Sequence, residues 1–306
     1  MMLLLSLVML FVCIVMPLGF AWLLWRADNA SLAGWLVTAA YASTIVFLVM
    51  TVGRWDIAGA YLRWAVLAIF LLALVLSCLR HRHRPFRAPD GRPIFRSHWA
   101  TILPLVVFLA GAIHVGLGLM VPTVARELAF PIENGRFMVV HGGKSVLINY
   151  HQAHAPQAYA VDMVGLNAVG FRAFGLHPQD LGSYAIFGAH VVAPCSGEVV
   201  EVADGLPDLT PPQTDPENPA GNHVVIVCNG LLVLLAHLRV GSVAVETGEA
   251  VTVGQAVGAV GNSGNTTEPH LHIHAVLEGT GSVLTGEAVP ILFDGRHPVR
   301  NAVFAR

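Results

Sequence analysis

Four long apolar stretches at the start of the chain constrain its fold more than any other feature of the sequence. Residues 1–25, 31–53 and 100–123 contain no Asp, Glu, Lys or Arg, and residues 57–79 contain only Arg63. A helix of about 20 residues crosses a hydrocarbon core about 30 Å thick, so each stretch is long enough to span a membrane. The whole chain has 55% hydrophobic and only 12% charged residues, far from the average of soluble proteins. We therefore predict four transmembrane helices within residues 1–123.

The first stretch has an alternative interpretation as a secretory signal peptide. Signal peptides start with basic residues and continue with an apolar region of about 7–15 residues. Residues 1–25 contain no basic residue and form a longer apolar run, so we interpret them as the first transmembrane helix.

An arginine-rich segment predicts the orientation of these helices. Residues 79–98 hold six of the 17 basic residues and one acid, Asp90. Positively charged loops stay on the cytoplasmic side of a membrane, and counting spans from this loop places everything after residue 123 outside the cytoplasm. This predicts a multi-pass protein of the inner membrane with a periplasmic C-terminal domain. Because the arginines lie between two spans, we expect the partner of this region to be the lipid bilayer and not a nucleic acid.

From about residue 130 the sequence changes to short apolar stretches separated by Gly, Pro, Asn and Asp, which is typical of an all-β domain. The pattern predicts strands over residues 137–140, 145–150, 158–164, 197–202, 223–227, 231–238, 256–260 and 270–277. We therefore divide the chain into a helical membrane region (1–123), a linker (124–136) and an extracytoplasmic β domain (137–306). Residues 204–221 are rich in proline and acidic residues, and either a tolerated surface insertion or a substrate lid fits them.

The four cysteines are divided between the two regions. Cys13 and Cys78 lie in apolar stretches, where a thiol behaves as a small apolar side chain, whereas Cys195 and Cys228 lie in the β domain. An oxidising compartment would permit a disulfide between the second pair, but the sequence does not show whether their strands are neighbours.

The last predicted strand carries three histidines at alternate positions behind a turn-forming segment, in the sequence GNSGNTTEPHLHIH. Alternate residues of a strand share one face, so His270, His272 and His274 project together. Such a face suits a metal site or an acid/base pair, although a short histidine-rich tract also fits a solvated cluster.

Two other segments of the β domain supply residues of the same kind. The segment NYHQAHAPQAYAVDM contains His151, His154 and Asp162, and His237 ends an apolar strand in LLAHL. A catalytic zinc ion typically takes three protein ligands from His, Asp, Glu or Cys and keeps a fourth position for water. His237 alone would be interpreted as a core or surface residue, but the three segments together predict a metal site.

Several motifs of the β domain, taken in their order, resemble the lysostaphin/LytM-type zinc metallopeptidases. They are VVAPCSGEVVEV, GNHVVIV, AHLRVGSVAVETGEAVTVGQAVGAV and GNSGNTTEPHLH with its following aliphatic strand, and the resemblance extends over about residues 142–277. Enzymes of this family cut peptide cross-links of bacterial cell walls. The resemblance implies two antiparallel sheets around a metal-holding groove, a Zn²⁺ cofactor, and a membrane-anchored zinc metalloendopeptidase that hydrolyses peptidoglycan or another peptide.

The resemblance also implies roles for individual residues. The implied zinc ligands are His151, Asp162 and His272, and the implied catalytic residues are His237 and His270. One catalytic histidine would act as general base and the other would donate a hydrogen bond to the oxyanion. The sequence does not distinguish between them.

The first ligand departs from the family's common H-x-x-x-D pattern, because Ala158 stands four residues before Asp162. The segment resembles instead a branch that reads N-x-H, a short loop and Q-x-Y-A-x-D. This favours His151 as the ligand and leaves His154 as the second candidate.

Two residues beside the predicted ligands have open roles. The family does not use the position of His274 for catalysis, which implies a place behind the ligands or on the surface. Glu268 stands where related sequences often have Gly, and either a rim acid facing a substrate amine or a solvated turn residue fits it.

Two other classes of function are compatible with parts of the sequence. A non-catalytic LytM-type module that activates other cell-wall hydrolases would have lost a ligand or a catalytic histidine, and none is clearly missing. A transporter or sensor would place its function in the helices, which carry few of the ionisable residues that mark a transport pathway.

Overall fold

The computed structural model describes residues 2–306 and divides into two compact units, the first ending at Gly116 and the second starting at Leu117. The helices are α1 (Met2–Leu10), α2 (Met16–Arg26), α3 (Leu32–Val52), α4 (Trp55–Ala58), α5 (Leu62–His81) and α6 (Ile94–Leu119), with a π-helical turn (Phe11–Val15) between α1 and α2. Four helical segments are long and apolar enough to cross a membrane, namely Leu4–Arg26, Leu32–Val52, Leu62–His81 and Ile94–Leu119. The four membrane-length helices predicted from the apolar stretches are therefore confirmed.

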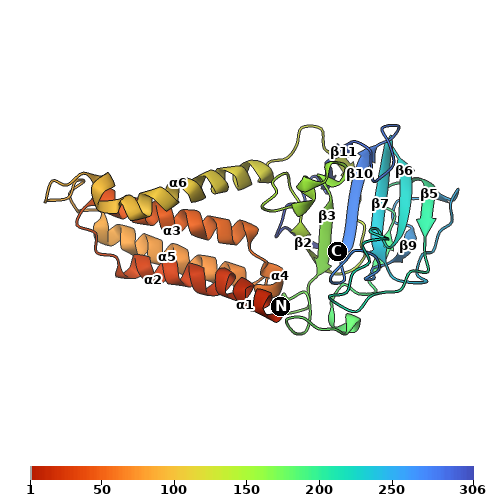
Figure 1. The fold of residues 1–306 in the computed structure, drawn as a ribbon, viewed down its shortest axis with the longest axis horizontal. Helices are drawn as coiled ribbons and strands as arrows, with labels where there is room; N and C mark the ends of the chain where they lie inside the picture. Colours follow the sequence, from red (N-terminus) through yellow and green to blue (C-terminus); the bar gives the residue numbers. More distant parts are fainter. Residues whose placement is uncertain (1) are drawn as a thin grey trace. The chain divides into compact units, whose positions relative to one another are not determined.

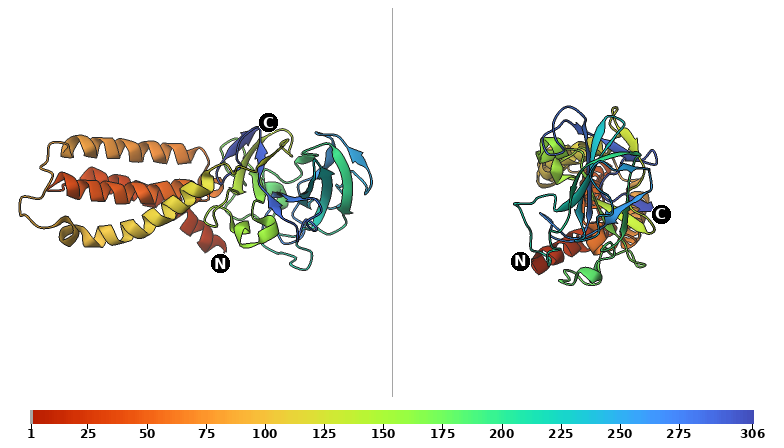
Figure 2. Two further views of the ribbon diagram at one scale, coloured as in Figure 1. Left: turned by 90° about the horizontal axis from the view of Figure 1, so that it is seen from above. Right: turned by 90° about the vertical axis from the view of Figure 1, so that its right-hand side faces the viewer.

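Within the helical unit, α2, α3 and α5 run side by side (Figures 1 and 2). A buried polar contact joins two of them, because the Trp35 Nε1 of α3 donates to the Ser77 hydroxyl of α5 over 3.0 Å. Large apolar side chains face outwards, among them Trp22 at 67% and Val107 at 68% exposure. An apolar outer surface of this kind is typical of helices that meet lipid.

The second unit contains thirteen strands. They are β1 (Arg126–Leu128), β2 (Arg136–His141), β3 (Val161–Gly165), β4 (His190–Val192), β5 (Gly197–Ala203), β6 (Asn222–Cys228), β7 (Leu231–Leu238), β8 (Ala250–Val251), β9 (Ala256–Ala259), β10 (Leu271–Leu277), β11 (Ala288–Val289), β12 (Ile291–Phe293) and β13 (Val303–Ala305). Nine strands form one antiparallel sheet in the order β13-β2-β3-β10-β7-β6-β5-β8, with β11 added to β10. Two further pairs are β4 with β9, antiparallel, and β1 with β12, parallel.

The centre of the large sheet follows from its sequence. The strands β6 and β7 consist largely of Val, Ile and Leu and are buried along most of their length, as expected where both faces of a sheet are covered. Asn229 and Gly230 connect them, both with positive φ (54° and 75°), as a two-residue type I′ hairpin requires. The strands β3, β10, β7 and β6 lie next to one another in Figure 1.

One predicted strand is wrong, and several short strands escaped prediction. Residues 145–150 form turns that lead into a 3-10 helix (Tyr150–Ala153). Backbone groups of this segment form hydrogen bonds with one another, since the Ile148 and Asn149 N–H groups both donate to the Ser145 carbonyl. The strands missed are two or three residues long, and one of them, β1, lies in the segment expected to be a linker and pairs with β12.

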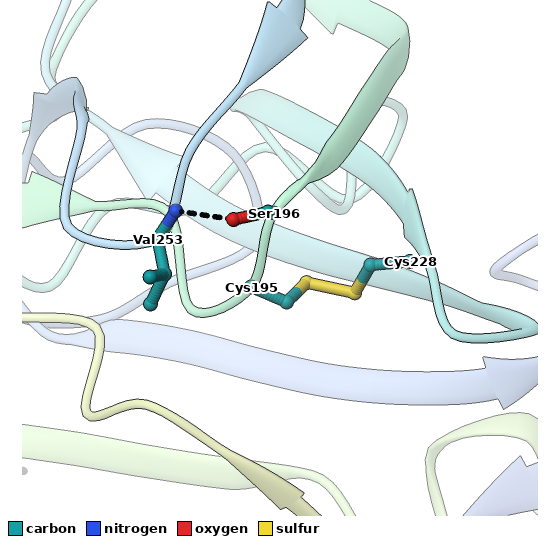
Figure 3. The surroundings of a disulfide bond; sticks show 4 residues. All are labelled: Cys195, Ser196, Cys228 and Val253. Atoms are coloured by element: carbon teal, nitrogen blue, oxygen red, sulfur yellow. Dashed lines mark hydrogen bonds between the residues drawn. A yellow bond between two sulfur atoms is a disulfide. The ribbon is translucent and has the colours of Figure 1, made fainter.

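The pairing of Cys195 with Cys228, which the sequence left open, is present as a disulfide (Figure 3). It joins the segment before β5 to the end of β6, and both residues belong to the main hydrophobic core. Beside it, the Val253 N–H donates to the Ser196 hydroxyl over 2.9 Å. The disulfide therefore ties two strands of the large sheet from within the core.

Candidate metal centre and active site

Three neighbouring strands bring the candidate site together. Asp162 of β3 and His272 of β10 are direct partners in the antiparallel pairing of these strands. On its other side, His272 is paired with Ala236 of β7, the residue before His237. His151 comes from the 3-10 helix that precedes β3. Side chains from distant parts of the chain therefore meet at one place on the sheet.

Asn149 fixes the 3-10 helix at its start. Its side-chain oxygen accepts from the His151 N–H (3.2 Å), and its Nδ2 donates to the carbonyls of Gly143 (3.1 Å) and Ala160 (3.0 Å). The side chain is completely buried. Asn149 thus acts as a helix N-cap and also ties both ends of the loop that carries His151. The sequence showed this residue only as the Asn of the N-x-H pattern.

His151, Asp162 and His272 form a compact buried cluster. His151 Nε2 lies 2.9 Å from Asp162 Oδ2, and His272 Nδ1 lies 2.8 Å from Asp162 Oδ1. The three ligand atoms all lie within 4.8 Å of one another. The sequence-predicted ligand set is therefore brought together, while His154 is exposed and lies outside this cluster.

In His151 and His272, the ring nitrogen that does not face Asp162 has a hydrogen-bond partner of its own. That partner indicates where the ring hydrogen lies. His151 Nδ1 lies 3.1 Å from the Gln157 side-chain oxygen. An amide oxygen only accepts hydrogen bonds, so Nδ1 carries a hydrogen, and in the neutral imidazole the lone pair is on Nε2, the nitrogen that faces the carboxylate.

The same reasoning applies to His272. His274 Nε2 donates to the Val283 carbonyl over 2.7 Å, which leaves His274 Nδ1 to accept from His272 Nε2 at 2.9 Å. His272 Nδ1 therefore turns a lone pair towards Asp162. Two imidazole nitrogens and a carboxylate converge in a buried space, and such a set can hold a cation. Imidazole and carboxylate together fit a metal ion such as zinc.

The pKa shifts in the cluster show that the Asp162 carboxylate favours positive charge beside it. Burial acts to lower the pKa of His151, but the Asp162 carboxylate and hydrogen bonds to Asp162 and Gln157 outweigh it and raise the pKa. Burial acts to raise the pKa of Asp162, but His151 and His270 hold it well below its usual range. Burial lowers the pKa of His272. Asp162 is therefore ionised at neutral pH, and its negative charge favours a cation in this space.

His237 and His270 lie beside the cluster, with ring centroids 4.7 Å apart. His237 Nδ1 donates to the Ser263 carbonyl and His270 Nδ1 to the Glu268 carbonyl, both over 2.9 Å. The Nε2 atoms of both rings therefore carry lone pairs, and His270 Nε2 lies 3.8 Å from Asp162 Oδ1. His237 has φ 62°, a conformation that residues other than Gly adopt at a cost, mostly where function fixes it. Burial and the neighbouring histidines His270 and His272 lower the pKa of His237 well below its ordinary value.

A cleft of about 500 Å³ opens at the cluster. His151, His237 and His272 line it, and so does His154, the second candidate ligand. The other lining residues are the polar Tyr150, Gln157 and Asn265 and the small or apolar Ala153, Ala155, Pro156, Pro219, Ala220, Leu234, Ala236 and Leu284. The cleft is large enough for a peptide segment and gives it access to His237 and to two residues of the cluster.

Residues 204–221 contribute Pro219 and Ala220 to the wall of this cleft. The segment is tied to the turn before β10, because the Asn262 N–H donates to Asp208 Oδ1 over 2.7 Å and the Asp215 N–H donates to the Gly264 carbonyl over 2.9 Å. The segment is therefore anchored to the turn before β10 and forms part of the cleft wall.

Glu268 and His274 have defined partners. His274 is buried behind His272, which agrees with a place behind the ligands. The Glu268 carboxylate neither projects into solvent nor stands alone at the rim, since it contacts the buried Arg172 at 2.7 Å. No sequence signal pointed to Arg172, which lies 96 residues from Glu268.

A β domain with a buried His–Asp–His group that could hold a metal ion, and with His237 and His270 beside it, defines a candidate metallohydrolase. Residues 182–283 match the family model of Peptidase family M23. This match agrees with the resemblance of the β domain to the lysostaphin/LytM type.

The chain is 31% identical over 168 residues to the peptidoglycan DD-endopeptidase ShyA of Vibrio cholerae. The match covers 51% of this chain and 38% of that relative, so the chain spans well under half of its length. Among solved structures, a zinc-containing peptidase from Vibrio cholerae is 21% identical with a TM-score of 0.31, covering 50% of this chain and 37% of the other. The lysostaphin catalytic domain of Staphylococcus simulans is 21% identical with a TM-score of 0.25, covering 38% and 84%.

Proposed function

We propose that this protein is a membrane-anchored zinc metalloendopeptidase that hydrolyses peptide bonds of peptidoglycan outside the cytoplasm. The observation that carries the proposal is the grouping of four histidines around Asp162. His151 Nε2 and His272 Nδ1 face its carboxylate at 2.9 and 2.8 Å. His237 and His270 lie beside them with each Nδ1 bound to a backbone carbonyl, which leaves each Nε2 available for proton transfer. The match to a peptidase family and the similarity to a peptidoglycan endopeptidase support the substrate class.

In this proposal His151, Asp162 and His272 hold the zinc ion. When bound, zinc supplies Lewis acidity, which polarises a carbonyl group and lowers the pKa of water. Either Nε2 of His237 or His270 can accept a proton from the attacking water and return it to the leaving amine, because each Nδ1–H is already engaged with a backbone carbonyl. A general base of this kind typically contributes about 10²- to 10⁴-fold in rate.

Three features support an extracytoplasmic position of the β domain. The arginines of residues 79–98 favour a cytoplasmic location of that loop, four helices are long and apolar enough to cross a membrane, and Cys195 and Cys228 form a disulfide. Structural disulfides persist in oxidising compartments. Peptidoglycan would then be within reach of the cleft.

The full chain, purified in detergent, tests the metal assignment by elemental analysis. We expect about one zinc ion per chain, loss of zinc in Asp162→Ala and His272→Ala, and a strong reduction in His151→Ala. His154→Ala is the matched control and should keep its zinc. Full zinc occupancy in Asp162→Ala and His272→Ala would refute the ligand assignment.

Digestion of isolated cell-wall sacculi tests the activity. His237→Ala and His270→Ala should keep zinc but release soluble wall fragments about 10²- to 10⁴-fold more slowly than the unaltered chain. Near-normal cleavage by both variants would contradict the mechanism. If the unaltered chain binds zinc and cuts no wall material, but stimulates a second wall hydrolase, the protein is a regulatory module instead.

A further inference from the structure

Arg172 is an almost completely buried charge that the proposed mechanism does not use. Its Nε and Nη2 both contact Glu268 Oε2 at 2.7 Å. Its Nη2 also donates to the Leu176 carbonyl over 3.1 Å, and its guanidinium lies 5.9 Å from the Tyr184 ring centroid. A buried arginine held from three sides adopts one orientation, so it defines where the Glu268 side chain lies.

Glu268 connects this arginine to the site through its main chain. The Glu268 carbonyl accepts from His270 Nδ1 over 2.9 Å and from the Thr266 hydroxyl over 2.8 Å. Pro269, between Glu268 and His270, has a fixed φ and is buried. A displacement of residue 268 is therefore transmitted to the imidazole of His270.

We propose that Arg172 is a positioning residue for His270. Its ion pair with Glu268 fixes the 268 carbonyl, which keeps the hydrogen of His270 on Nδ1 and leaves Nε2 bare and directed at the metal cluster. This inference rests on the proposed function, because it concerns the proton acceptor of that reaction. The physical basis is that catalytic geometry tolerates little error, as a displacement of about 1 Å can cost about 10²-fold in rate.

Breaking this ion pair also changes the stability of the protein, so a purely structural role must be separated from a positioning role. Loss of one partner leaves the other charge buried and uncompensated. A purely structural role would lower the thermal midpoint of the chain but leave the surviving folded molecules with an unchanged turnover number and an unchanged His270 tautomer.

The experiment compares Arg172→Met with the unaltered full chain in detergent, loaded with zinc. Three quantities are measured: zinc content, kcat and KM on a cross-linked muropeptide dimer, and the His270 tautomer by long-range ¹H–¹⁵N spectra of ¹⁵N-histidine-labelled protein. We expect zinc content to stay near one per chain, kcat to fall about 10- to 100-fold with a smaller change in KM, and part of the His270 hydrogen to move from Nδ1 to Nε2.

Two further variants and a control sharpen the result. Arg172→Lys keeps a charge beside Glu268 and should recover part of kcat, and the double variant of Arg172→Met with Glu268→Gln removes the uncompensated charge and should be more stable than the single one. Arg296, which is exposed, is a control for the loss of an arginine that lies over an aromatic ring, that of Phe304, and donates to a backbone carbonyl. Arg296→Met should leave kcat and the His270 spectrum unchanged.

An unchanged kcat together with an unchanged His270 tautomer in Arg172→Met overturns the proposal. If Arg172→Met does not fold, Arg172→Lys and Glu268→Gln carry the same comparison, and normal kcat and tautomer in both overturn it. If the unaltered chain cuts no muropeptide, the proposed function fails, but the tautomer measurement still decides the role of Arg172. Retention of the hydrogen on Nδ1 in the variant then overturns the inference.

Discussion

Replacing Asn149 by Ala perturbs the support of His151 without touching the metal cluster itself. The change removes the acceptor of the His151 N–H and the donor to the Gly143 and Ala160 carbonyls. A buried polar group left without its partner costs about 1–3 kcal/mol, and three such groups bring the upper limit to about 9 kcal/mol. Water entering the space of the removed amide offsets part of this. We therefore expect the local free energy of opening to fall by about 2–4 kcal/mol.

Amide hydrogen exchange, read by mass spectrometry on the full chain in detergent, measures this loss in peptides that cover His151 and β3 (Val161–Gly165). Because the 3-10 helix would no longer be fixed, zinc affinity should also fall by about 10- to 100-fold. Asn167→Ala is the matched control, since the Asn167 side chain also accepts from two backbone N–H groups but lies outside the site. Unchanged exchange and unchanged zinc affinity in Asn149→Ala, with zinc lost in His151→Ala, would refute the reasoning.

Three other predictions address different parts of the chain. His274→Phe removes the acceptor of the His272 Nε2–H, so zinc affinity measured by chelator competition should fall by about 10- to 100-fold; equal affinity would show that the hydrogen bond does not orient His272. Cys195→Ser breaks a disulfide with a sequence separation of 33, and the chain-entropy relation gives a loss of about 3–4 kcal/mol, detectable as faster hydrogen exchange in β5 and β6; exchange as slow as in the unaltered chain contradicts it. A reporter active only in the cytoplasm should work when fused after Arg87 and stay silent after Arg306, and activity after Arg306 would place the site inside the cell.

Local sequence patterns predicted the parts of the fold that depend on local physics. Long uncharged stretches predicted the membrane-length helices, and the Val- and Ile-rich β6 and β7 were expected almost as observed. Residues 145–150 were expected as a strand because their apolar residues fit one, whereas Asn149 competes for the nearby backbone carbonyls and favours turns. That competition is decided by tertiary contacts and is invisible to periodicity.

In the candidate site, too, the sequence predicted some of the residues and not others. The five candidate residues came from motifs that the sequence displays, and their roles stay predictions. The groups that hold them in place lie far away along the chain, as with Arg172 and Glu268, 96 residues apart. The partners of Cys195 and His274 were equally undetermined, because strand order decides which side chains meet. Sequence reasoning therefore identified the candidate site residues but not the distant residues that contact them.

The hydrogen bonds between residues 204–221 and the turn before β10 have a consequence for recognition. Because this wall is anchored, the cleft has its shape before a substrate binds. A large fraction of the molecules is then competent to bind, which favours affinity. The entropy lost on binding then falls mainly on the flexible substrate and not on the protein. Under the proposed function, a wall peptide with a side branch directed at Pro219 and Ala220 would be disfavoured by steric clash with this wall.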